Sequence, residues 1–312
     1  MLKLLLPFFS FFSGCHSMDE VSCQGIGAYE EFAGGNLTVP RGYYTLIELL
    51  LENISSLCGG SDKARSFEAL KGCKVVKVEW PGTSTGESHQ RPTTNKQEET
   101  QSSTTVKVTC DNGRTFQCAH LIVTLPLGVL KAATTSSKDG RQQLFSPPLP
   151  AYKQEVISRM GFGVVDKIFL EYSSRAVISS LFTRDGVHTD EMMLLWGEEE
   201  RGQWYAKIFS IYRISDHCIQ LWVTGEEAAT LEGLSAQAVN QQLTTQLRRF
   251  FADPAFPPAD HVTITRWGAD PFTRGSYSYI SVGSSVEDVK RLAMPVYHRA
   301  TDAKVCGGMY FL

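Results

Sequence analysis

The chain has 312 residues, of which 42% are hydrophobic and 20% are charged, and its formal net charge is −3. This composition is typical of a globular protein with a buried core and excludes a mainly disordered chain. Proteins that bind nucleic acid usually carry a basic excess, so we expect no nucleic acid among the partners.

The first fifteen residues, MLKLLLPFFSFFSGC, form an apolar run after Lys3. The run is too short to cross a bilayer, so we expect no membrane anchor. Three interpretations stay open: a secretory signal peptide, a buried helix, or the artificial start of a truncated chain. A signal peptide would make the protein secreted; without one we expect a cytoplasmic protein, or a peroxisomal one in a complete form.

Hydrophobic periodicity predicts mixed α and β structure along the rest of the chain. Residues 42–57 have apolar side chains at helical spacing. Residues 81–103 contain almost no apolar side chain, so we expect a disordered insertion there. Further helices are predicted at 152–160 and 235–251, and strands at 74–80, 105–110, 115–125, 164–172, 218–225 and 261–267.

Lys167 is the most informative single residue of these predicted elements. It shares one face of its strand with Val165 and Phe169, whereas Ile168 and Leu170 lie on the other face. An exposed lysine on an edge strand is one interpretation. If the side chain is buried, it loses basicity and can position a water molecule or act as a base.

The segment RWGADPFTRGSYSYISVGSS, residues 266–285, combines aromatic residues with turn-forming residues. Trp267 and Tyr277 suggest an aromatic wall around a planar cofactor or an amine, with a plain core cluster as the alternative. Gly275 and Gly283 suit either a close approach of the backbone to a ligand or a simple turn. The sequence contains no G-x-G-x-x-G, Walker, G-x-S-x-G or H-E-x-x-H motif.

The eight cysteines are scattered and include no Cys-x-x-Cys pair. Such pairs are the usual signature of a zinc site, so we expect buried free thiols and no metal.

The 266–285 segment resembles the one shared by flavin-containing polyamine oxidases, in which a tryptophan is followed by P-[YF]-x-R-G-S-Y-S-Y and V-G-S. Three other segments are similar to that family and occur in the family's order. They are HSMDEVS (16–22), HLIVTLPLGVLK (120–131) and the stretch from FSPPLP to FLEY (145–172).

The resemblance implies a fold of class α/β and α+β, in which a partial, Rossmann-like FAD-binding domain is interleaved with a mixed-sheet substrate domain. The FAD domain would comprise residues 35–150 and 266–312. The substrate domain would comprise residues 1–34 and 151–265.

The resemblance also implies roles for single residues around a noncovalent FAD. Lys167 matches the catalytic lysine that holds a water molecule against the flavin. Trp267 and Tyr277 match aromatic residues beside the flavin ring, and Val75 matches a strand residue whose backbone contacts the adenine end. Ser276 stands where monoamine oxidases carry the cysteine that is bonded to the flavin.

Glu20 and Ser22 match a pair in the substrate tunnel of spermine oxidases, and a carboxylate there suits an ammonium group. Tyr277 would contact the substrate as well as the cofactor. A solvated position on a helix is the alternative for Glu20.

The implied reaction is oxidation of a polyamine, spermine or an N1-acetylated polyamine, by a monomeric enzyme. Hydride leaves the carbon beside nitrogen, the iminium hydrolyses to an aminoaldehyde and a shorter amine, and oxygen is reduced to hydrogen peroxide. The alternative is a noncatalytic derivative that binds polyamines or a protein partner.

The sequence departs from the family pattern at both ends. The family's G-x-G-x-x-G turn does not precede His16, and its G-E-[AH]-T-[HS] segment does not follow VCGGMYFL. We therefore expect a fragment of an oxidase, which on its own binds FAD weakly or not at all because the cradle for the pyrophosphate is missing.

Overall fold

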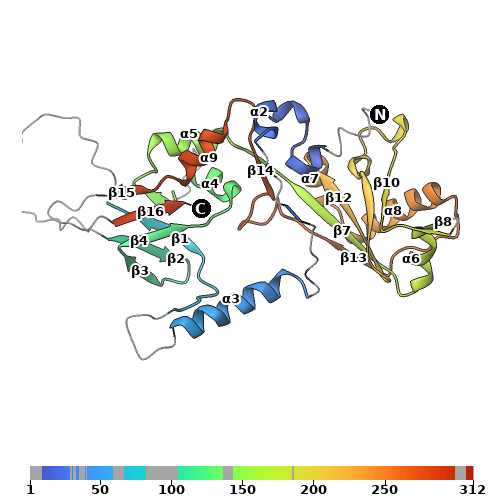
Figure 1. The fold of residues 1–312 in the computed structure, drawn as a ribbon, viewed down its shortest axis with the longest axis horizontal. Helices are drawn as coiled ribbons and strands as arrows, with labels where there is room; N and C mark the ends of the chain where they lie inside the picture. Colours follow the sequence, from blue (N-terminus) through green and yellow to red (C-terminus); the bar gives the residue numbers. More distant parts are fainter. Residues whose placement is uncertain are drawn as a thin grey trace, which may run out of the picture.

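The computed structural model describes residues 9–28, 30, 33–34, 39, 41–58, 67–81, 105–135, 143–184, 186–298 and 307–311. The sheets form two lobes side by side, with strand β14 (Tyr277–Tyr279) between them (Figure 1). Each lobe has its own cluster of buried apolar side chains.

The first lobe is built on a five-stranded antiparallel sheet of order β10-β11-β12-β7-β13. The alternation expected around Lys167 is present in β7, because Ile168 and Leu170 are fully buried on the face opposite to it. Helices α6, α7 and α8 complete the core on that buried face. The bounds are β7 (Val165–Glu171), β10 (Glu191–Met193), β11 (Ser210–Ser215), β12 (Cys218–Thr224), β13 (His261–Ile264), α6 (Arg175–Phe182), α7 (Glu226–Glu232) and α8 (Ala236–Phe251).

Short elements border this sheet. They are β8 (Thr183–Arg184), β9 (Val187–His188), and two 3-10 helices, η2 (Glu198–Glu200) and η3 (Trp204–Lys207).

The second lobe contains a four-stranded sheet of order β3-β2-β1-β5 and a three-stranded sheet of order β15-β16-β4. Helices α4, α5 and α9 pack in this lobe. The bounds are β1 (Val75–Glu79), β2 (Val106–Cys110), β3 (Thr115–Cys118), β4 (His120–Val123), β5 (Phe145–Ser146), β15 (Val296–His298), β16 (Gly307–Phe311), α4 (Leu127–Thr134), α5 (Ala151–Arg159) and α9 (Val286–Ala293).

A buried lysine ties α5 to the end of α9. Lys153 is fully buried, and its Nζ donates to the carbonyls of Leu292, at 2.6 Å, and of Met294. The last carbonyls of a helix have no partner within the helix, so a cation there satisfies them and opposes the negative end of the helix dipole. Burial lowers the pKa of Lys153 to about 8.

Between the lobes, β14 (Tyr277–Tyr279) pairs with β6 (Gly161–Gly163), and the N-terminal segment lies against both. Residues 9–13 are helical, η1 (Met18–Glu20) and α2 (Cys23–Ile26) follow, and Ser22 N donates to Ile280 O. Phe11 packs against Phe209 and Trp222 with ring centroids 4.8 and 4.6 Å apart. Residues 9–15 of the apolar run are thus packed against the protein, whereas residues 1–8 lie outside the described residues, so the three interpretations of the whole run remain predictions.

Helix α3 (Tyr43–Cys58) is amphipathic, as expected, but none of its residues is buried. It stands apart from both lobes (Figure 1). None of the described helices is long and apolar enough to cross a membrane.

The mixed α/β class expected from the sequence is confirmed. The run 115–125 was expected to be one strand, and this was wrong: the chain bends at Ala119 and enters a second sheet as β4. Both halves of the run alternate or are apolar, and the sequence pattern therefore does not reveal the change of sheet. The expected insertion at 81–103 lies almost entirely outside the described residues.

The expected domain bounds remain a prediction. Val156 and Ile157 of α5 are buried in the second lobe, although the expected boundary at 150/151 assigns them to the substrate domain. The described cysteines are free, but only Cys15 and Cys110 are buried.

Candidate active site

Lys167 lies in the middle of β7 with a half-buried side chain. Its partner across the ladder is Trp222 of β12, and Lys167 Nζ lies 4.2 Å from the centroid of the Trp222 ring. Partial burial lowers the pKa of Lys167. The lysine is therefore a desolvated cation over an aromatic face, and not the exposed edge-strand lysine of the alternative interpretation.

Hydrogen bonds from Thr265 fix the backbone of Lys167. Lys167 N donates to Thr265 Oγ1 at 2.8 Å, and Thr265 N donates to Lys167 O at 3.0 Å. The residue that follows β13 thus binds Lys167 on the side of β7 opposite to Trp222. Two residues later, the turn that begins at Trp267 starts.

The turn from Trp267 to Gly275 is closed on itself. Trp267 O accepts from Gly275 N at 2.8 Å and from the Thr273 hydroxyl at 2.7 Å. Gly275 has φ +136, where a side chain is strained, and a Cβ there would also overlap the Phe162 ring. Of the two interpretations of this glycine, the structure therefore supports the turn. The Trp267 ring is 41% exposed, which does not fit a plain core cluster.

Ser276 and Tyr277 follow this turn and lie next to the start of β7. Val165 N donates to Ser276 Oγ at 2.6 Å, so the Ser276 side chain binds the backbone two residues before Lys167. The Tyr277 side chain contacts Gly14 and is 37% exposed, and partial burial raises its pKa. We call Lys167, Trp267, Ser276 and Tyr277 the site network; hydrogen bonds that involve the backbone of β7, β6 and the Trp267 turn link them, not contacts between their four side chains.

Glu20 and Ser22 belong to the N-terminal segment that runs beside β14, and the side chain of each makes a hydrogen bond within the protein. The Tyr279 hydroxyl donates to Glu20 Oε2 at 2.8 Å, and burial together with the Glu20 carboxylate raises the pKa of Tyr279. Ser22 caps α2 by accepting from Gly25 N at 3.3 Å. Glu20 is half-buried, which differs from the solvated position of the alternative interpretation.

Val75 is not part of this network. It begins β1 in the sheet of the other lobe, opposite Cys110, and it is 40% exposed.

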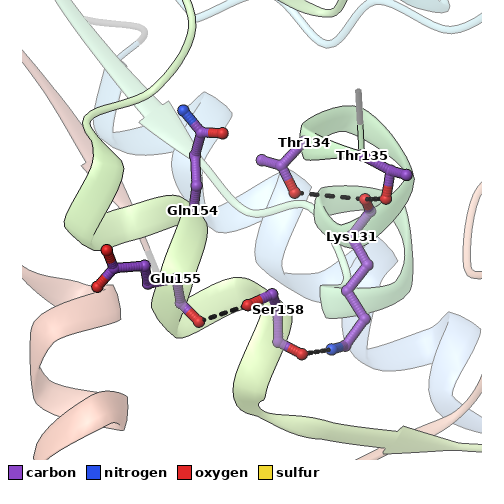
Figure 2. Close-up of a pocket in the computed structure, with 6 residues that line it drawn as sticks. All are labelled: Lys131, Thr134, Thr135, Gln154, Glu155 and Ser158. Atoms are coloured by element: carbon purple, nitrogen blue, oxygen red, sulfur yellow. Dashed lines mark hydrogen bonds between the residues drawn. The ribbon is translucent and has the colours of Figure 1, made fainter. Parts of the chain in front are cut away.

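A cavity of about 430 Å³ lies between α4 and α5, away from the candidate residues. Figure 2 shows Lys131 reaching across it, where Lys131 Nζ donates to Ser158 O at 2.9 Å. Its other lining residues are Thr134, Thr135, Gln154 and Glu155. None of these lining residues is aromatic, so the cavity offers no flat side chain against which a planar ring could stack.

Asp166, Trp222 and Thr265 are site residues that sequence reasoning missed. Asp166 is fully buried, accepts from Thr265 Oγ1 at 2.8 Å and accepts from Trp267 N at 3.1 Å. The alternation of β7 was a usable signal, because it places this acidic residue on the apolar face with Ile168 and Leu170. Among the described residues, no group of three His, Cys, Asp or Glu could hold a metal ion.

The sequence of residues 3–311 matches the model of the family described as flavin containing amine oxidoreductase. The chain belongs to that family. The flavin-containing amine oxidoreductases include the polyamine oxidases that the motifs resemble, so the predicted resemblance is confirmed, with FAD as the family's cofactor.

Several curated relatives of the chain are oxidases of polyamines by name, and others are named histone demethylases. The chain is 30% identical to the bovine (Bos taurus) peroxisomal N(1)-acetyl-spermine/spermidine oxidase over 91% of its own length and 51% of the relative. It is 31% identical to the human (Homo sapiens) protein of the same name, with the same two shares. It is also 30% identical to probable polyamine oxidase 5 of Arabidopsis thaliana, over 90% of this chain and 49% of that one. The chain thus spans about half the length of these relatives.

The site network fits the ring end of a flavin. Trp267 and Tyr277 keep exposed aromatic surface although hydrogen bonds and close contacts fix the backbone around them, and Lys167 lies on the neighbouring strand with reduced basicity. A glycine-rich turn for the pyrophosphate is not part of the sequence. The residues present therefore suit the isoalloxazine ring and not the phosphates.

Proposed function

We propose that this chain takes part in the FAD-dependent oxidation of a polyamine, with spermine or an N1-acetylated polyamine as substrate. The observation that carries the proposal is the site network of Lys167, Trp267, Ser276 and Tyr277 in a chain of the flavin-containing amine oxidoreductases. FAD, when bound, supplies the acceptor for the hydride of the amine; the protein supplies position and environment.

Lys167 is the proposed catalytic residue. Its lowered pKa leaves a larger neutral fraction than a free lysine has at the same pH, and its Nζ can then hold a water molecule on the aromatic side of the sheet. Trp267 and Tyr277 offer flat surfaces against which a ring and a neutral amine can be oriented. Ser276 uses its hydroxyl on Val165 N, which agrees with noncovalent binding of the cofactor.

Glu20 is the proposed contact for an ammonium group of the substrate, and Tyr279 holds its carboxylate in place. Ser22 is proposed beside it, although it uses its hydroxyl on the helix cap. Val75 is proposed for the adenine end of FAD. The expected monomer and the cytoplasmic or peroxisomal location remain predictions.

The test uses the natural protein, purified from the cells that make it. We expect heat denaturation to release FAD into the supernatant, and we expect hydrogen peroxide to form when spermine or N1-acetylspermine is added in air. Comparison of the two amines identifies the preferred substrate. A protein that releases no flavin and forms no peroxide with either amine contradicts the proposal.

A further inference from the structure

Two acidic side chains receive the first two amides of the Trp267 turn. Asp166 Oδ1 accepts from Trp267 N at 3.1 Å, and Glu232 Oε1, at the end of α7, accepts from Gly268 N at 2.6 Å. We call Asp166 and Glu232 the carboxyl clamp. Hydrogen bonds from backbone amides to charged or partly charged acceptors are among the stronger ones in proteins.

The two carboxyl groups of the clamp accept from successive amides, so they lie close together. Asp166 Oδ2 is buried and receives no hydrogen from the described residues. Ionised carboxylates only accept hydrogen bonds, so this contact is satisfied when one proton lies between the two groups. Burial, together with the Glu232 carboxylate, raises the pKa of Asp166 to about 7, so a shared proton is present near neutral pH.

The nearby basic side chains are directed elsewhere. Arg266, at the end of β13, donates to the backbone carbonyls of Glu232, at 3.1 Å, and of Leu234, at 3.3 Å. Lys167 projects from the opposite face of β7 and lies over Trp222. These contacts fix the end of α7 without placing an arginine or lysine hydrogen bond on either carboxyl group.

The clamp connects both halves of the candidate site. Trp267 carries the hydrogen bonds that close its turn, so fixing the Trp267 amide fixes the turn as a whole. Through the Thr265 hydroxyl, the same Asp166 oxygen is linked to the amide of Lys167. One buried carboxyl group thus holds Trp267 directly and Lys167 through one intermediate.

We propose that Asp166 and Glu232 are positioning residues that share one proton and hold Trp267 and Lys167 in a fixed arrangement. This inference rests on the proposed function only for the statement that Trp267 faces a flavin ring. Loss of the proton leaves a negative charge on the fully buried Asp166 beside the half-buried Glu232 carboxylate, and this repulsion drives the carboxyl groups apart and releases the two amides.

Hydrogen–deuterium exchange of the 312-residue chain, without added flavin or amine, tests the clamp at the amides of Trp267 and Gly268. We expect wild-type protection factors at both amides to fall as the pH rises through about 7. Asp166→Asn keeps an acceptor for Trp267 and offers an N–H to Glu232, so it should stay protected at every pH. Asp166→Ala should lose about tenfold or more protection at Trp267, as expected for one lost charge-assisted hydrogen bond.

Glu226→Gln, an exposed change on the same helix, is the matched control and should behave like the wild type. If Asp166→Ala does not fold, the Asp166→Asn and Glu232→Gln proteins decide the question, because both should remove the pH dependence. A pH dependence that persists in both, or protection that survives in Asp166→Ala, overturns the inference. Neither result depends on flavin or peroxide, so failure of the clamp is distinguishable from failure of the proposed oxidase.

Discussion

At the scale of single residues, Lys167 combines a backbone that is fixed within a central strand with a side chain that is only half-buried. Its neighbours Asp166 and Ile168 are fully buried, whereas its own side chain lies on the aromatic and polar face beside Trp222. The strand and Thr265 hold the backbone of Lys167, and its side chain is half-buried. Such a position suits a group that must hold a water molecule in one place.

We expect Lys167→Met to slow the reoxidation of reduced flavin by oxygen in the natural protein by roughly 10²-fold, a typical contribution of one positioned proton-transfer group. Methionine keeps the length and the contact with Trp222 but cannot hold a water molecule. Stopped-flow absorbance of the flavin measures the rate. Lys290→Met, an exposed change on α9, is the control. Equal reoxidation rates in the two variants would remove this role from Lys167.

The raised pKa of Asp166 predicts that stability depends on pH. The folded chain keeps a proton on Asp166 up to about pH 7, whereas the unfolded chain loses it near pH 3.8. Between these values the folded state binds more protons, so the free energy of unfolding should fall as the pH rises from about 4 to about 7, and should level off above. The difference between wild type and Asp166→Asn in urea unfolding isolates this contribution. An identical pH dependence in both proteins would show that Asp166 does not titrate in this way.

The sequence singled out those candidate site residues that lie within one continuous pattern, and their roles remain predictions. Lys167 was found by alternation along β7, and Trp267 and Tyr277 by their unusual setting among glycines. Trp222 could not be found in this way, because its place beside Lys167 depends on how β12 pairs with β7 across about fifty residues of chain. Asp166 could have been predicted as a buried acidic residue, because the alternation of β7 places it on the same face as Ile168 and Leu170.

At the scale of elements, β6 and β14 form a short ladder that leaves no room for a side chain at either glycine of β6. A Cβ at Gly163 would overlap the carbonyl oxygen of Gly14, and a Cβ at Gly161 would overlap the Tyr279 ring. The glycines therefore allow the N-terminal segment and β14 to approach β6 closely, and this approach keeps Tyr277 beside the start of β7.

We expect Gly163→Ala to lower the free energy of unfolding by about 1–3 kcal/mol or more, because backbone atoms, and not a flexible side chain, must move. Gly233→Ala at the end of α7 is the control, since its φ is −79 and a Cβ there meets only Thr230 O at 3.4 Å. Denaturant unfolding of the two variants measures the difference. Similar stability of both would mean that the contact with Gly14 is looser than described.

Strands β1, β2, β7, β12 and β13 and helices α3, α5 and α8 were predictable, because each lies within a longer segment of regular hydrophobic period. The 3-10 helices, α2 and the two-residue strands were not, since such short elements form through contacts with the rest of the fold and carry little periodicity of their own. The break at Ala119 was missed for a related reason: which sheet a strand joins is decided by its distant partner, here β16.

At the scale of the whole molecule, the two lobes have separate apolar cores. The core of the first lobe is formed by residues between Val164 and Ile264, a nearly continuous part of the chain. The core of the second lobe combines residues from 78–162 with residues from 292–311. That the two domains are built from alternating segments of the chain was expected only from the family resemblance. The sequence of one segment does not indicate which distant segment packs into the same core.

We therefore expect two separable thermal transitions in calorimetry. Ile219→Ala, in the first core, should lower only one transition, and Met309→Ala, in the second, only the other; both side chains are fully buried. Each change should cost about 2–5 kcal/mol within its own lobe. A single transition that both variants lower equally would show that the lobes unfold as one unit.

The N-terminal segment has a consequence for biosynthesis. His16 meets the amide of Glu226 across 210 positions, and Glu20 meets Tyr279 across 259. At ribosomal rates of about 5–20 residues per second, these partners follow roughly 10–50 s after the segment emerges. Phe11 and Cys15, which end up packed in the finished protein, must stay uncovered through that interval. A nascent chain of this kind offers a holding chaperone an early and long-lived target.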